Sequence, residues 1–188
     1  MRVSKRWNQK QKPRTIGQIS SAVAGTIWKL GSQSLLNLET EKFETTSQKQ
    51  RLDVLEEIFA YLIHQCDRRA YELTDADNRA AYITSLAKDM ARLIEDSRVD
   101  MEGVGNYQQA FLDRLNQRMA AYSLFKFSND EGASFVMRCA FGDFIKEAMG
   151  ARDNKWIPDY IIGREAPLAE NALKSTLAGL VDFEMLAS

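Results

Sequence analysis

Apolar side chains recur at three- and four-residue steps along most of this chain, a spacing that predicts amphipathic helices. The strongest stripe begins after Ser47, which has with Gln50 the spacing of a capping box at a helix start. Charged residues lie off that stripe, and we expect them to face solvent. Its apolar members are Leu52, Leu55, Ile58, Phe59, Leu62, Ile63, Cys66 and Ala70.

The segments on either side of this helix follow the same spacing. Residues 16–30 carry an apolar face, although Gly25 and Gly31 weaken the helix. A glycine in a helix interior costs about 1 kcal/mol relative to alanine. The apolar residues after Thr74 and Asp75 recur in the same way, so we expect another helix to begin there.

Later segments complete the predicted set of helices. Residues 96–106 are predicted to form a loop, because they are mostly polar and include two glycines. Ser128 and Glu131 have the spacing of a second capping box, so a helix is predicted to open there. Gly163 is expected to end a short turn. Pro167 is expected in the first turn of the final helix, where its missing N–H would have been unpaired anyway.

The chain is therefore predicted to be all-α. No segment alternates between apolar and polar residues as a half-buried strand does, and no internal repeat is present. With 188 residues, of which 45% are hydrophobic, it is long enough to bury one core. We expect a single-domain bundle of six to seven helices with short loops, in which residues 1–14 form a basic flexible arm and residues 15–188 the α-helical domain.

The two cysteines and the N-terminal residues indicate the cellular compartment of the protein. Cys66 and Cys139 form no Cys-x-x-Cys pair, so we expect thiols in a reducing compartment, with a lone disulfide as the alternative. Gln18, Ser20 and Ser21 interrupt the apolar run that a secretory signal requires. A mitochondrial presequence fits the composition better, but lysines are as prominent as arginines. We expect an uncleaved arm on a cytoplasmic protein.

Charge is distributed unevenly along the chain. Residues 1–38 hold no Asp or Glu and seven bases, whereas the remaining 150 residues hold 18 bases and 26 acids. This basic N-terminal segment is expected to contact the acidic remainder of the chain, a second copy of the chain or an anionic surface. Nucleic acid is an unlikely partner, because the whole chain has a net charge of −1 and Trp7 is the only aromatic residue of the arm.

His64 is the only histidine, so it is the centre of the candidate site. On a helix, Glu57, Tyr61, His64 and Arg68 follow one line, and Asp67 is the nearest acid after the histidine. The candidate catalytic residues are Glu57, His64, Asp67 and Arg68, and the candidate metal ligands are Glu57 and His64. Neither Glu-x-x-His nor His-Glu-x-x-His is present. The alternative is a structural histidine at the border of the buried stripe.

A metal at His64 would need further ligands from another helix. The acids available there are Asp75, Asp77, Asp89 and Glu95. A separate group of charged residues predicts a charged seam between two helices: Asp67, Arg68, Arg69, Glu72 and Arg79. We favour a structural role for this seam over a binding role.

The sequence lacks the commonest catalytic signatures. It contains no Gly-x-Ser-x-Gly nucleophile motif and no phosphate-binding loop. We therefore expect a non-enzymatic interaction or scaffold protein that acts as a homo-oligomer and uses no cofactor. One alternative is a metal-binding or acid–base enzyme centred on His64. The second is a peripheral membrane protein anchored by residues 1–38, for which the rival interpretation is that residues 16–30 form a core helix.

Overall fold

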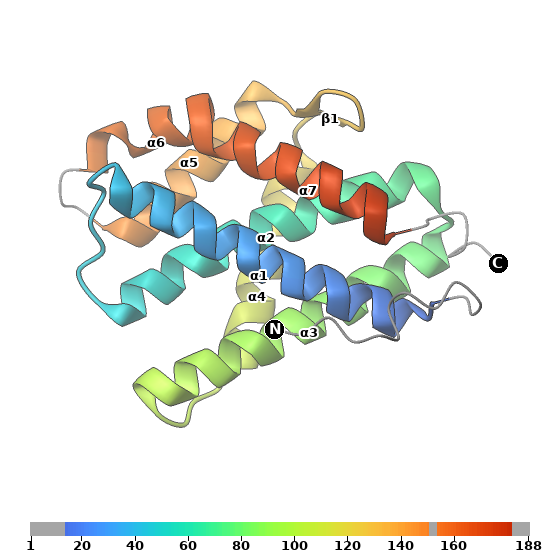
Figure 1. Ribbon diagram of the computed structural model, residues 1–188, viewed down its shortest axis with the longest axis horizontal. Coiled ribbons are helices and arrows are strands. Elements are labelled where there is room, and N and C mark those ends of the chain that lie inside the picture. The colour runs from blue at the N-terminus through green and yellow to red at the C-terminus, as the bar shows by residue number, and fades with distance from the viewer. Residues whose placement is uncertain (1–13, 151–153, 182–188) are drawn as a thin grey trace.

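The computed structural model describes residues 14–150 and 154–181, which form the predicted all-α, single-domain bundle (Figure 1). Within these residues six helices have 15 or more residues, and α6 adds one turn. The α-helices are α1 (Ile16–Thr40), α2 (Gln48–Leu73), α3 (Ala76–Glu102), α4 (Tyr107–Ser123), α5 (Phe135–Met149), α6 (Ile157–Tyr160) and α7 (Ala166–Leu180).

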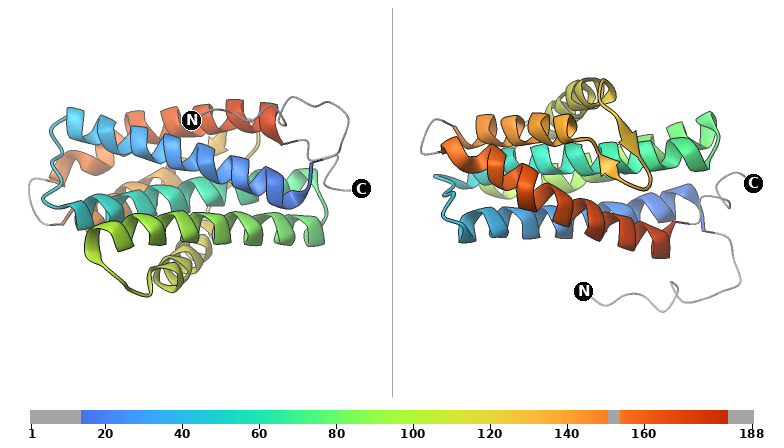
Figure 2. Two further views of the ribbon diagram at one scale, coloured as in Figure 1. Left: turned by 60° about the horizontal axis from the view of Figure 1, so that its bottom comes forward. Right: turned by 90° about the horizontal axis from the view of Figure 1, so that it is seen from above.

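Helix α2 is the centre of the bundle. It packs against α1, α3, α4, α5 and α7, so nearly its whole circumference is covered (Figure 2). Its predicted apolar stripe is buried from Leu52 to Ala70. Because neighbours surround it, α2 also buries polar residues outside the stripe, among them Glu56, Glu57 and His64. These polar side chains need partners inside the protein.

Side-chain caps begin α2 and α3 where the sequence predicts them. The Ser47 hydroxyl accepts from the Gln50 backbone N–H at 3.1 Å, which confirms the start of α2. The Gln50 side chain accepts from the N–H of Thr46, one residue before the expected position. Asp75 caps α3 by accepting from two backbone N–H groups. Each cap satisfies donors that the helix itself leaves unpaired.

Two predicted boundaries are wrong. The predicted loop at residues 96–106 is mostly helix, since α3 continues to Glu102 and only Gly103–Asn106 connects it to α4. The predicted capping box at Ser128 opens no helix: the pair forms a turn between the two-residue strands β1 (Phe127–Ser128) and β2 (Gly132–Ala133). Helix α5 begins at Phe135, with Ser134 as its cap.

The segment before α7 differs from the predicted isolated turn. A 3₁₀ turn, η2 (Asn154–Trp156), leads into α6, and a π-helical turn, η3 (Ile161–Glu165), leads directly into α7. Gly163 therefore does not end the turn. The backbone at Pro158 approaches α5 closely at Gly142, where a Cβ would lie 2.9 Å from Cα of Pro158.

Helix α1 belongs to the core. Its apolar residues Ile19, Val23 and Ile27 are buried, which confirms the interpretation of residues 16–30 as a core helix. Arg14 donates to the Leu180 carbonyl at the end of α7. The rest of the predicted arm, residues 1–13, lies outside the described residues. No helix among those described is long and apolar enough to cross a membrane.

Candidate functional site

His64 is enclosed in the bundle and is 1% exposed. Neither ring nitrogen has a hydrogen-bond partner in the described part of the chain. Its ring lies against Tyr122 of α4, with 5.3 Å between the centroids. Burial lowers the pKa of His64 to about 4, and the Asp67 carboxylate only partly opposes this effect. The imidazole is therefore neutral at physiological pH.

Glu57 is held by arginines rather than by the histidine. The Arg118 guanidinium donates to both of its carboxylate oxygens, at 2.6 and 2.8 Å, and Arg114 lies 3.8 Å away. Arg118 also covers the face of the Phe144 ring, 3.7 Å from its centroid. These contacts join α2 to α4 and α5. A bidentate pair to a buried carboxylate fixes that carboxylate in place.

Asp67 and Arg68 point to different surroundings. Asp67 accepts from Arg79 of α3 at 2.7 and 2.6 Å, which confirms the predicted charged seam between the two helices. Arg68 lies over the ring of Tyr71, 5.6 Å from the centroid. Glu72 accepts from the side-chain amide of Asn129. The seam therefore depends on one ion pair between helices rather than on an Arg68–Glu72 pair.

The structure separates the residues that the sequence places on one line. Glu57, Asp67 and Arg68 each have their own neighbours, and none of them hydrogen-bonds His64. Across the described ranges, no three His, Cys, Asp or Glu side chains are grouped so as to hold a metal ion. Of the four acids expected to complete a metal site, three are engaged elsewhere: Asp75 caps α3, Asp89 accepts from Ser21, and Glu95 accepts from Gln108. The fourth, Asp77, is exposed in the first turn of α3. A site at His64 stays a prediction.

A second buried polar cluster was missed by sequence reasoning. Tyr61 donates to Glu170 of α7, which also accepts from Arg138 of α5 at 3.0 and 2.8 Å. The Tyr61 ring stacks on Phe141 with 4.0 Å between centroids. Burial and the neighbouring carboxylate raise the pKa of Tyr61, so it remains a hydrogen-bond donor. These contacts join three helices, and no local signal in the sequence pairs residues 109 positions apart.

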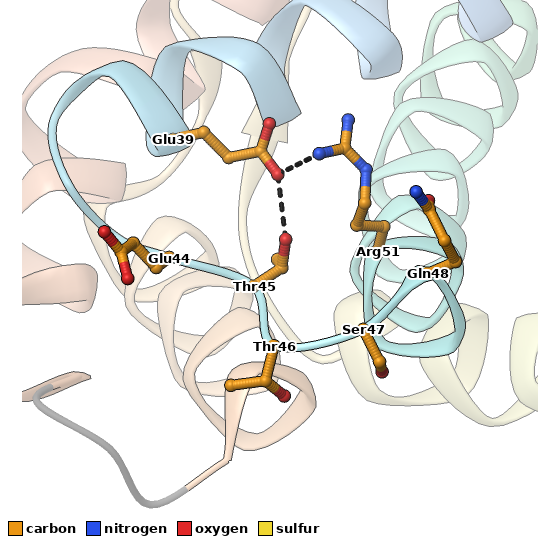
Figure 3. A pocket seen from close by; sticks show the side chains of 7 residues that line it. All are labelled: Glu39, Glu44, Thr45, Thr46, Ser47, Gln48 and Arg51. Atoms are coloured by element: carbon orange, nitrogen blue, oxygen red, sulfur yellow. Dashed lines mark hydrogen bonds and ion pairs between the residues drawn. The ribbon is translucent and has the colours of Figure 1, made fainter.

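Two polar hollows are explained by internal contacts. One, of about 430 Å³, lies where the α1–α2 connection turns, and Glu39 there accepts from Thr45 and Arg51 (Figure 3). The other, of about 470 Å³, lies between α2, α4 and α5 and is lined by the Glu57–Arg118 pair. Each hollow contains one arginine–glutamate pair, Arg51 with Glu39 in the first and Arg118 with Glu57 in the second, and these pairs stabilise the connections between helices.

An apolar groove of about 270 Å³ lies between α1, α2 and α3. Helices α1 and α3 diverge toward their C-terminal ends, and the first turns of α2 lie between them (Figures 1 and 2). Leu36 of α1 and Met101 of α3 stand on the two rims and are 49% and 54% exposed. The buried side chains Leu35, Leu52 and Leu55 also line the groove.

The groove has an apolar interior and a polar edge. Trp28 lines it and stacks on Phe59, with 5.2 Å between the centroids, so this wall is backed by the core. Its volume is below the roughly 300–1,000 Å³ typical of small-molecule sites. A groove of this size can accommodate one or two apolar side chains of a partner protein. Its polar members are Ser32, Gln48, Arg51 and Ser97.

Sequence reasoning missed the groove for two reasons. It described the apolar face of the first helix only over residues 16–30, before Leu36, and it assigned Met101 to a loop. The apolar residues at 35, 36 and 38 were the available signal for the longer helix.

Comparison with protein families, with curated proteins and with solved structures finds no match to this chain.

Proposed function

We propose that this protein is a non-enzymatic helical interaction protein that acts as a homo-oligomer. The apolar groove between α1, α2 and α3 carries the proposal. Leu36 and Met101 expose apolar surface on both rims, and an apolar patch with a polar edge is typical of protein contact sites. A partner that covers the groove removes this surface from water.

The polar interior supports a structural role for the buried charges. An acid–base catalyst needs a group that can exchange protons with a substrate. In the described part of the chain, the buried carboxylates instead accept hydrogen bonds from internal donors. These carboxylates are Glu56 (from Arg98), Glu57 (from Arg118), Asp67 (from Arg79), Glu165 (from Asn37) and Glu170 (from Tyr61).

We place the protein in the cytoplasm as part of the same proposal. Cys66 and Cys139 are free thiols, which fits a reducing compartment. Protein, rather than nucleic acid, is the proposed partner, since the chain as a whole is slightly acidic. Membrane contact would depend on the basic residues of the arm, because the apolar face of α1 is packed in the core.

Light scattering after size-exclusion chromatography, over a wide range of protein concentrations, tests the proposal. We expect a mass above the 21.4 kDa of one chain. Leu36→Glu is expected to lower that mass, because it places a charge at the rim of the groove. Leu168→Glu is the matched control: this leucine is 52% exposed but lies on α7, so the mass is expected to stay unchanged. A 21.4 kDa species at every concentration contradicts the proposal.

A further inference from the structure

We infer that the groove binds a second copy of this chain in a two-fold symmetric dimer, in which α1 of each copy lies along α3 of the other. The inference rests on the proposed function and names its partner. In a two-fold interface the same patch occurs on both sides, so each contact is made twice. The patch must therefore contain both members of every complementary pair.

The two rims of the groove carry opposite charges. Lys29 is exposed on α1, seven residues before Leu36, and therefore lies on the same strip of the helix. Asp96 and Asp100 are exposed on α3; Asp100 follows the groove residue Ser97 by three positions and so lies beside it on the helix surface, and Asp96 lies one turn before Asp100. These three charges have no hydrogen bond or ion pair with another described residue. A two-fold axis through the groove pairs each Lys29 with the aspartates of the other copy.

Neighbouring charges do not compete for these residues. Arg92, the exposed base closest to Asp96 on α3, pairs with Asp89 at 3.5 Å. Arg51, at the end of the groove, pairs with Glu39. The α1 rim contains no acid before Glu39, because residues 1–38 hold none. The free charges along the groove are thus a base on one rim and acids on the other.

The shape of the patch is also self-complementary. Leu36 and Met101 protrude from the rims, and the cavity between them lies on the same face. A cavity of about 270 Å³ admits an apolar side chain from the opposite rim of the partner. The apolar contacts supply affinity, while the charged rims fix the orientation of the two copies.

The area of the face is sufficient for a stable dimer. The 25 residues of α1 extend over about 38 Å, and two adjacent helices are roughly 20 Å wide. The face formed by α1 and α3 therefore measures about 750 Å², close to the ~800 Å² that each partner of a specific interface typically buries.

Charge reversal on each rim tests the orientation. We expect Lys29→Glu alone, and Asp96→Lys with Asp100→Lys, each to weaken dimerisation roughly tenfold or more at low salt, because each change places like charges opposite one another. Combining all three substitutions is expected to restore the wild-type dissociation constant to within about threefold. Sedimentation equilibrium measures this constant directly.

Lys88→Glu is the matched control. Lys88 is exposed on α3, nine residues before Ser97, and therefore lies on the opposite side of that helix from the groove. Its reversal is expected to leave the dissociation constant unchanged. A dimer that ignores both rim variants, or one that the combined variant fails to restore, overturns the inference and leaves the proposed function standing. A protein that is monomeric at every concentration overturns both.

Discussion

Acidification is expected to destabilise the fold through His64. The buried imidazole has a pKa of about 4, against 6.5 for an unperturbed histidine. Between these two values the unfolded chain binds more protons than the folded one. The stability that depends on a neutral His64 is therefore fully present above pH 6.5 and is lost as the pH falls toward 4. The charges that act on the ring are the carboxylate of Asp67, which favours protonation, and Arg68 and Arg79, which oppose it.

The size of the effect follows from the two pKa values. The difference between 6.5 and about 4 amounts to about 2 kcal/mol of lost stability at pH 5 and about 3 kcal/mol at pH 4. Native domains are stable by only about 5–15 kcal/mol, so this loss is readily measured. Other groups titrate in the same range, and a variant without the histidine is needed to isolate its share.

His64→Leu is that variant. Urea unfolding followed by circular dichroism gives the free energy of unfolding at pH 7.5 and at pH 5. We expect wild type to lose about 2 kcal/mol more than the variant over this interval. At pH 7.5 the variant is expected to be more stable by about 1 kcal/mol, because both nitrogens of His64 lack partners among the described residues.

Gln65→Leu is the control, since it also removes a buried polar side chain but no titrating group. It should lose stability on acidification as wild type does. If wild type and His64→Leu lose stability in parallel between pH 7.5 and pH 5, the buried, neutral state of this histidine is refuted.

Two further substitutions test the packing and the ion pairs. Gly31→Ala is expected to destabilise the protein by about 1–3 kcal/mol in urea unfolding, because the new Cβ would lie 2.8 Å from Cδ1 of Phe59. Gly25→Ala, in open space on the same helix, is expected to stabilise it by about 0.5–1 kcal/mol; equal effects at both positions would contradict the close approach. Arg118→Ala leaves Glu57 buried without its bidentate partner and is expected to cost about 3 kcal/mol. In the double variant with Glu57→Leu most of that loss should disappear, and an additive loss would argue against the pair.

The helical class could be predicted because the periodic signal extends over many residues. The stripe on α2 spans five turns, and the caps at Ser47 and Asp75 are local in sequence. The strands β1 and β2 have two residues each, too short for alternation to be visible. The end of α3 was missed for a different reason. Arg98 there donates to Glu56 and Asp53 of α2, so a segment that is polar in sequence is fixed by distant partners.

The candidate site could not be predicted because neighbours in several directions surround α2. Residues on one line of an isolated helix share a solvent face, but on a central helix they meet different elements. Glu57 meets arginines of α4, Tyr61 meets Glu170 of α7, and Asp67 meets Arg79 of α3. Spacing along one helix fixes the direction of a side chain, whereas the tertiary arrangement decides what it contacts.

The uneven distribution of charge along the chain bears on how two copies would be oriented at the groove. An acid-free N-terminal segment points in general terms to an anionic partner, and residues 1–13 lie outside the described residues. Within the fold, the same bias leaves the exposed part of α1 before Glu39 with Lys29 as its only charged side chain. The facing rim of α3 carries Asp96 and Asp100. A helix rim whose only charge before Glu39 is a base, opposite a helix rim with exposed acids, favours one relative orientation of two copies, because any arrangement that places α3 against α3 opposes like charges.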